Sequence, residues 1–259
     1  MLIIHSLSNL SIYLLFNYYL FIFKLRFGEN MVNKVYGIGV GPGDKELLTL
    51  KAVKILEKVN TIFVPISKKD KSSFAYEIIK ELILCEDKKI VELLFPMSKD
   101  REFLKKYWEE ASEAIMNEEG EVAVITIGDP TLYSTFSYVW SILKENNIET
   151  EIVNGISSPF AGAGRLNIPL VEGDEKIAIL PQGRDLEKYL DEFDTLVVMK
   201  TNDLEDKLKS LKDKECDYLI GVVNRVTCEN EKFMLGKINE IDFSQFKDYL
   251  SLAIIKKLK

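Results

Sequence analysis

Residues 35–59 read VYGIGVGPGDKELLTLKAVKILEKV, and this stretch alone indicates the class of fold. The apolar run at 35–40 predicts a buried strand, and the glycines and proline at 41–44 predict a tight turn after it. Over 50–59 the apolar residues recur three and four positions apart, which is the spacing of one face of a helix. A strand, a turn and an amphipathic helix in this order open a β-α-β unit, so we expect an α/β protein.

The same alternation continues to Asn154. Further strands are predicted over 61–65, 90–96, 122–127 and 148–153. The helices between them are predicted over 74–82, 98–120 and 136–146. Ser98 is the expected N-cap of the helix that begins there. Strands that alternate with helices in this way form a mostly parallel sheet with helices on both faces.

The pattern changes after Asn154 and predicts a second domain. Helices are expected over 159–166, 185–193 and 204–211, and strands over 176–180 and 195–200. Three β-rich segments follow without helices between them, over 218–226, 232–238 and 249–255, the first two forming a hairpin. We therefore expect an N-terminal α/β domain over 31–154 and a C-terminal α+β domain with antiparallel strands over 155–259.

Residues 1–30 form an apolar extension in which 2–23 carry no formal charge. A signal anchor fits the length of this run, although polar residues dilute it. A cleaved signal peptide fits less well, because no basic residue precedes the run and no A-x-A site follows it. We favour a third interpretation, in which translation starts at Met31 and the extension is spurious. The protein from there on is expected to be cytoplasmic and without membrane contact.

The composition excludes several kinds of chemistry. The chain has 259 residues, 47% of them hydrophobic, with a net charge of −7, which disfavours binding to nucleic acid. Its single histidine, His5, lies in the extension, so catalysis through histidine and metal sites with histidine ligands are disfavoured in the body. Cys85, Cys216 and Cys228 form no CxxC pair, and we expect neither a disulfide nor a protein-bound metal.

Three loops carry polar or glycine-rich motifs at predicted strand ends. The first, at 37–44, fails the dinucleotide pattern G-x-G-x-x-G in both registers, so it is either a tight turn or a place where backbone approaches a large ligand. The second, GDPTLYST at 128–135, contains Asp129, which either caps the next helix or accepts hydrogen bonds from a ligand. The third, NGISSP at 154–159, places the hydroxyls of Ser157 and Ser158 at a helix start.

Four segments together resemble the tetrapyrrole methylase superfamily, and the resemblance covers essentially residues 35–259. They are GVGPGDKELLTLKA at 39–52, GDPTLYST at 128–135, VNGISSPFAGAGRLNIP at 153–169 and VVMK at 197–200. The wording KELLT and TLYST is similar to the precorrin-2 C20-methyltransferase branch. Asn154 and Lys45 depart from the family pattern, which more often has proline at both turns.

The resemblance implies a two-domain homodimer that binds S-adenosylmethionine between its domains and methylates precorrin-2 or cobalt-precorrin-2 in cobalamin biosynthesis. It implies a cofactor site formed by Gly128, Asp129, Thr131, Leu132, Tyr133, Ser157, Ser158 and Met199. It also implies that Gly39, Gly41, Pro42 and Asp44 edge the trough for the tetrapyrrole.

A positively charged methyl donor and an electron-rich C20 carbon need little more than alignment, and positioning alone can supply roughly 7–11 kcal/mol. A proton must leave C20 afterwards; Asp129 and Tyr133 are the catalytic candidates for accepting it, and water is the alternative acceptor. The carboxylates of the substrate need local cations, for which Lys45 and Arg165 are candidates, together with Arg184, Lys200 and Arg225.

Two alternatives stay open. A uroporphyrinogen III C-methyltransferase would share the cofactor site but methylate ring carbons. A membrane-tethered binding protein would use residues 1–30 as its anchor and would show no turnover. Cobalt, where present, is expected to enter within the substrate ring.

Overall fold

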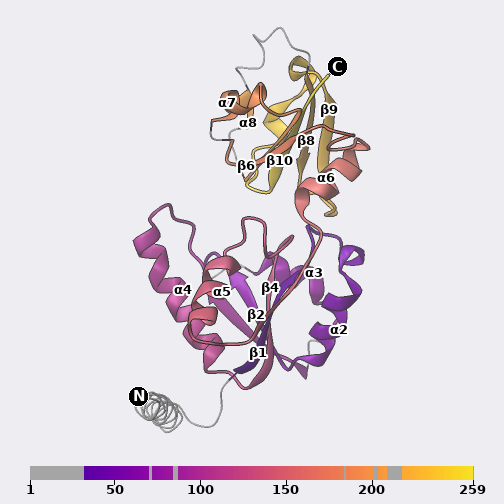
Figure 1. The fold of residues 1–259 in the computed structure, drawn as a ribbon. Helices are drawn as coiled ribbons and strands as arrows, with labels where there is room; N and C mark the ends of the chain where they lie inside the picture. The colour runs from indigo at the N-terminus through magenta and orange to yellow at the C-terminus, as the bar shows by residue number, and fades with distance from the viewer. Residues whose placement is uncertain are drawn as a thin grey trace, which may run out of the picture.

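The computed structural model describes residues 32–69, 72–83, 87–183, 185–200, 204–208 and 218–258. The expectations for the 1–30 extension, for Arg184 and for the pair Cys85 and Cys216 therefore lie outside the described residues. Figure 1 shows two lobes, each built around its own sheet, with the short helix α6 (Ser158–Leu166) beside the connection between them. Along the described stretches, no helix has the length and apolarity that crossing a membrane requires.

The first sheet is parallel throughout, with strand order β3-β2-β4-β1-β5. Its strands are β1 (Val32–Gly39), β2 (Thr61–Ile66), β3 (Lys89–Leu94), β4 (Gly120–Thr126) and β5 (Thr150–Val153). The central strands β1 and β4 are buried along most of their length because both faces of the sheet are covered. The predicted parallel sheet is confirmed, and its strand ends lie within a few residues of the prediction.

Helices pack on both faces of this sheet, as the sequence predicts. They are α2 (Leu50–Lys58), α3 (Phe74–Ile79), α4 (Arg101–Met116) and α5 (Phe136–Glu145). On one face, α2 and α3 bury Leu56 and Ile79 against Ile38 of β1. On the other, α4 and α5 bury Ile115 and Val139 against β4. Figure 1 shows the two helix pairs on opposite sides of the strands.

The start of α4 corrects one prediction. Ser98 is not the N-cap; Asp100 is, because its Oδ1 accepts hydrogen bonds from the backbone N–H groups of Glu102 (3.0 Å) and Phe103 (3.1 Å). The Ser98 hydroxyl instead accepts from the N–H of Asp100 at 3.1 Å, in the turn before the helix begins. The helix also ends at Met116, before the expected Gly120, which has a positive φ of 72° and begins β4.

The second sheet has strand order β6-β7-β10-β8-β9. Its strands are β6 (Ile177–Pro181), β7 (Thr195–Met199), β8 (Tyr218–Asn224), β9 (Lys232–Gly236) and β10 (Ser251–Lys257). Only β6 and β7 pair in parallel; the other pairs are antiparallel, which confirms the predicted α+β character. The helices α7 (Leu186–Leu190) and α8 (Leu204–Leu208) cover one face, while α6 packs on the other. In the described residues, α7 is shorter than the 185–193 helix that the sequence predicts.

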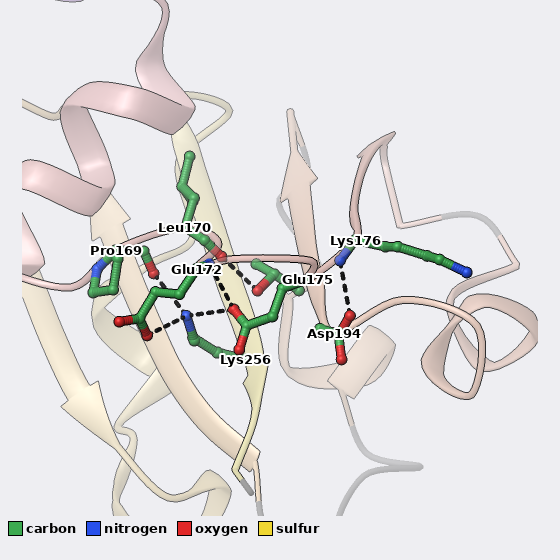
Figure 2. Close-up of polar contacts among 8 residues, drawn as sticks. Pro169, Leu170, Glu172, Glu175, Lys176, Asp194 and Lys256 are labelled. Carbon is green, nitrogen blue, oxygen red and sulfur yellow. Dashed lines mark hydrogen bonds and ion pairs between the residues drawn. The ribbon is translucent and has the colours of Figure 1, made fainter.

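The segment between α6 and β6 is fixed to β10 by one lysine. The Lys256 side chain is only 12% exposed, and its Nζ lies 3.2 Å from the carbonyl oxygen of Pro169. The same Nζ pairs with the carboxylates of Glu175 (3.0 Å) and Glu172 (3.5 Å), and Figure 2 shows all three contacts meeting at the ammonium. Because a buried ammonium is stable only when its donors are satisfied, this network holds the segment that leads into β6.

Candidate functional site

Three glycine-containing loops meet where β1, β4 and β5 end, at the carboxyl edge of the parallel sheet. Gly41 and Gly128 form an antiparallel bridge, in which the Gly128 N–H donates to the Gly41 carbonyl at 2.7 Å. A Cβ atom at Gly39 would lie 2.4 Å from the Gly128 carbonyl oxygen, and one at Gly155 would lie 2.3 Å from the same oxygen. Gly39 and Gly155 are therefore needed because the backbone of a neighbouring loop approaches each of them closely.

The Asp129 carboxylate joins the second loop to the third. Its Oδ1 accepts from the N–H (2.8 Å) and the hydroxyl (2.5 Å) of Thr131. Its Oδ2 accepts from the side-chain amide of Asn154 and the N–H of Gly155, both at 3.0 Å. Burial opposes the charge, but these bonds outweigh it and hold the pKa of Asp129 below its usual range. A carboxylate offers about four acceptor positions, and the protein occupies four of them.

Asp129 does not cap α5, so that alternative is wrong. The N-cap position of α5 is Thr135, whose side chain makes no capping bond, and the N–H of Phe136 donates to the hydroxyl of Ser134 at 3.2 Å. The departure from the family pattern at Asn154 also gains a physical role. Its side-chain amide is one of the donors to Asp129, and a proline in its place has no such group.

Tyr133 links the second loop to the second lobe through its side-chain hydroxyl and through its backbone carbonyl. Its hydroxyl donates to the carbonyl of Ile179 in β6 at 2.6 Å, and its own carbonyl accepts from Lys200 Nζ at 2.5 Å. Its φ of 49° is rare for a non-glycine residue, so these contacts hold a conformation that is locally unfavourable. Burial raises the pKa of the Tyr133 hydroxyl.

Two adjoining cavities open beside these loops. The smaller has a volume of about 360 Å³ and is lined by Asp129, Thr131, Leu132, Gly155, Ile156, Ser157, Phe160 and Ile179. The larger has a volume of about 610 Å³ and is lined by residues of both lobes. Asp129, Leu132 and Ser157 line both cavities, so the two spaces share a wall.

The structure brings the predicted cofactor residues together. Thr131 lines the smaller cavity; Gly128, Tyr133, Ser158 and Met199 line the larger; the remaining three form the shared wall. Met199 reaches this place because it ends β7, in the second lobe.

Of the six residues predicted to bind substrate, only Pro42 lines a described cavity. Gly39 and Gly41 instead pack against Gly128 in the second loop. Lys45 forms an ion pair with Glu81 at 2.7 Å. Arg165 pairs with Glu231, and its guanidinium lies 4.8 Å from the centre of the Phe233 ring.

The remaining member of that set, Asp44, helps the first loop to contact the second lobe. Its N–H donates to the hydroxyl of Thr227 at 2.9 Å, and its side chain accepts from the N–H of Glu46 at 2.8 Å. The preceding Gly43 is packed so tightly that a Cβ atom there would lie 2.6 Å from the sulfur of Cys228. The glycine loop is thus a contact between the two lobes.

The second lobe contributes charged residues to the larger cavity. Lys200 directly follows β7 and Arg225 directly follows β8, and both line it. Asp248 and Tyr249 also line it, and the sequence does not predict this: the strand expected over 249–255 begins only at Ser251, so both residues lie before it. The signal was available, since β10 runs antiparallel to β7 and β8 and its beginning must lie at their ends.

The cations of the larger cavity differ in their partners. Arg225 donates from Nε to the Asp248 carboxylate at 2.8 Å, which balances its charge. The Lys200 ammonium bonds to a neutral carbonyl, and burial lowers its pKa. Within the described residues, no three His, Cys, Asp or Glu side chains are grouped as a metal site would require.

Comparisons with known proteins point to one family. The family model of the tetrapyrrole (corrin/porphyrin) methylases matches residues 34–242. A probable cobalt-precorrin-2 C(20)-methyltransferase of Methanocaldococcus jannaschii is 65% identical over 231 residues, which are 89% of this chain and 99% of that protein. A cobalt-precorrin-2 C(20)-methyltransferase of Salmonella typhimurium is 30% identical over 190 residues, 70% of this chain and 78% of that one.

A solved structure has the same fold. It is a uroporphyrin-III C-methyl transferase from Thermus thermophilus in complex with S-adenyl homocysteine. It superposes with a TM-score of 0.60 and 20% identity, and the match covers 86% of this chain and 97% of that one.

Proposed function

This chain belongs to the tetrapyrrole (corrin/porphyrin) methylase family, and from that premise we propose that it methylates C20 of precorrin-2 or cobalt-precorrin-2. It is a C-methyltransferase, and its methyl donor is S-adenosylmethionine. The observation that carries the choice of substrate is the 65% identity, over 89% of the chain, to a probable cobalt-precorrin-2 C(20)-methyltransferase. The reaction belongs to cobalamin biosynthesis.

The smaller cavity fits the methyl donor. Leu132, Ile156, Phe160 and Ile179 provide an apolar wall suited to a purine ring, and the charged carboxylate of Asp129 favours a cation nearby. When bound, S-adenosylmethionine supplies a methyl group on a positively charged sulfonium. Asp129 contributes charge and loop shape here, because its acceptor positions are already occupied by protein donors.

The larger cavity fits the tetrapyrrole. The side chains of Phe74, Phe95 and Tyr249 are suited to the faces of a ring system, and they lie in the same cavity as the cations of the second lobe. Asp129, Leu132 and Ser157 line both spaces, so they border the junction between the two. A methyl group passing between the two ligands must cross there, so these residues determine how donor and acceptor are aligned.

The geometry favours positioning over base catalysis. Asp129 is a weak base because four hydrogen bonds stabilise its charged form and lower its pKa. The Tyr133 hydroxyl keeps its proton because it donates to Ile179 and its pKa is raised. We therefore assign both residues to holding the loop in place, and the proton of C20 leaves to solvent or to the substrate itself.

Further features of the proposal rest on the family resemblance and on the sequence patterns. The protein acts as a homodimer in the cytoplasm, holds no resident metal, and receives cobalt only within its substrate. Its domains are residues 31–154 and 155–259. Light scattering of the purified protein tests the dimer.

Incubation with labelled S-adenosylmethionine tests the activity. The chain should methylate precorrin-2 or cobalt-precorrin-2, and NMR should locate the new methyl on C20. Uroporphyrinogen III serves as the comparison substrate and should stay unmethylated. Methylation of uroporphyrinogen III, or of a carbon other than C20, would refute the proposed substrate while leaving the methyltransferase assignment intact.

A further inference from the structure

The two cations that line the larger cavity differ in whether a carboxylate neutralises them. Its described lining includes the cations Lys200 and Arg225 and the carboxylates Glu77, Asp129 and Asp248. Arg225 is balanced by Asp248, and Asp129 is satisfied by donors of the loops. Among the described residues, no carboxylate lies within ion-pair distance of Lys200, whose Nζ bonds to the carbonyl oxygen of Tyr133.

An ammonium in this position favours an anion. It has three N–H donors, and the Tyr133 carbonyl occupies one of them. Burial lowers the pKa of Lys200, which shows that the surroundings withhold part of the solvation that the charge would have in water. A carboxylate entering the cavity would restore that stabilisation through a charge-assisted hydrogen bond, without displacing Tyr133.

We propose that Lys200 binds one side-chain carboxylate of the tetrapyrrole and thereby sets the orientation of the ring in the larger cavity. The inference rests on the proposed function for the identity of the ring. Because the ammonium is held by the backbone of the loop 128–135, the bound carboxylate lies beside the loop that forms the shared wall. Lys200 is therefore a specificity-determining residue that places the ring relative to the methyl donor.

Uroporphyrin, a fluorescent porphyrin with carboxylate side chains, is the probe, and its methyl ester is the uncharged comparison. Lys200→Met should weaken binding of uroporphyrin by about 10- to 100-fold, the loss expected for a hydrogen bond between charged groups. Lys200→Gln, which keeps an N–H donor without the charge, should lose nearly as much, and Lys200→Arg should recover most of the affinity. Wild type and variants should bind the ester equally.

Lys88→Met is the matched control. Lys88 Nζ also donates to backbone carbonyls, those of Glu57 (2.9 Å) and Val59 (2.7 Å), but it lines neither described cavity. This variant should bind uroporphyrin like the wild type.

Two results would overturn the inference: unchanged affinity of Lys200→Met and Lys200→Gln for uroporphyrin, or an equal loss of affinity for the ester, which would indicate a collapsed cavity. Failure of the wild type to methylate precorrin-2 would refute the proposed function and would leave this binding comparison intact.

Discussion

Replacing Asp129 by asparagine tests whether one carboxylate organises the cofactor loop. The substitution keeps the shape of the side chain but turns one accepting oxygen into an NH₂ group. Two of the four donors that now bond to the carboxylate then lose their acceptor. A hydrogen bond to a charged group contributes about 1.5–3 kcal/mol, and neighbouring bonds are not additive, so we expect a loss of about 2–4 kcal/mol in unfolding free energy.

The same substitution should weaken binding of the cofactor product. Gly155, one of the donors, lies on the loop that continues into Ile156 and Ser157, and all three line the smaller cavity. Calorimetric titration with S-adenosylhomocysteine should show an affinity roughly 10- to 100-fold lower than that of the wild type. Urea denaturation gives the stability loss on the same preparation.

Asp100→Ala provides the matched control. It removes a carboxylate that accepts two backbone N–H groups at the start of α4, outside both described cavities. It should cost about 1 kcal/mol of stability and leave the affinity unchanged. If Asp129→Asn lost stability but kept wild-type affinity, Asp129 would be a structural residue and the argument from the shared wall would fail.

The pH dependence follows from the lowered pKa of Asp129. A carboxyl group whose pKa is lower in the folded state contributes stability above its unfolded value and loses it as the pH falls through the folded value. The stability difference between wild type and Asp129→Asn should therefore be constant above about pH 5 and shrink below the ordinary aspartate pKa of about 3.9. A stability difference that stayed constant down to about pH 2 would show that the shape of the Asp129 side chain, and not its charge, stabilises the fold.

Three further substitutions or truncations have expected outcomes. Gly39→Ala should lower the unfolding free energy by roughly 1–3 kcal/mol in urea denaturation, because the added Cβ would lie 2.4 Å from a backbone oxygen. Gly164→Ala is the control: its Cβ would meet nothing within 4 Å, so this substitution should be neutral or stabilising. Tyr133→Phe should lower kcat by less than the 10²- to 10⁴-fold typical of acid–base catalysis, and a larger drop with intact ligand affinities would make Tyr133 the proton acceptor. A chain that begins at Met31 should be soluble, folded and fully active, since β1 begins at Val32; insolubility would contradict the proposed start.

The elements of the fold were predictable where a local pattern defines them. The buried strand β1 and the helix α2 follow from apolar spacing within the segment 35–59, and the site edge follows from the rule that ligands bind at the carboxyl ends of parallel strands. Partners of charged residues were not predictable in this way. Lys45 pairs with Glu81, 36 residues along the chain, and no pattern in a single sequence shows which surface charge is already paired.

The loop 128–135 lines both cavities and is held by contacts in both lobes. Through Asp129 it is bound to the loop after β5 in the first lobe, and through Tyr133 it is bound to β6 and to Lys200 in the second. The lining of the smaller cavity therefore depends on one set of contacts within the first lobe and on a second set, through Tyr133, that crosses to the second lobe. A substrate carboxylate on Lys200 would act on the ammonium that also holds the Tyr133 carbonyl. Binding of the tetrapyrrole would then stabilise the loop conformation that the methyl donor requires, and by linkage the donor would favour the tetrapyrrole equally.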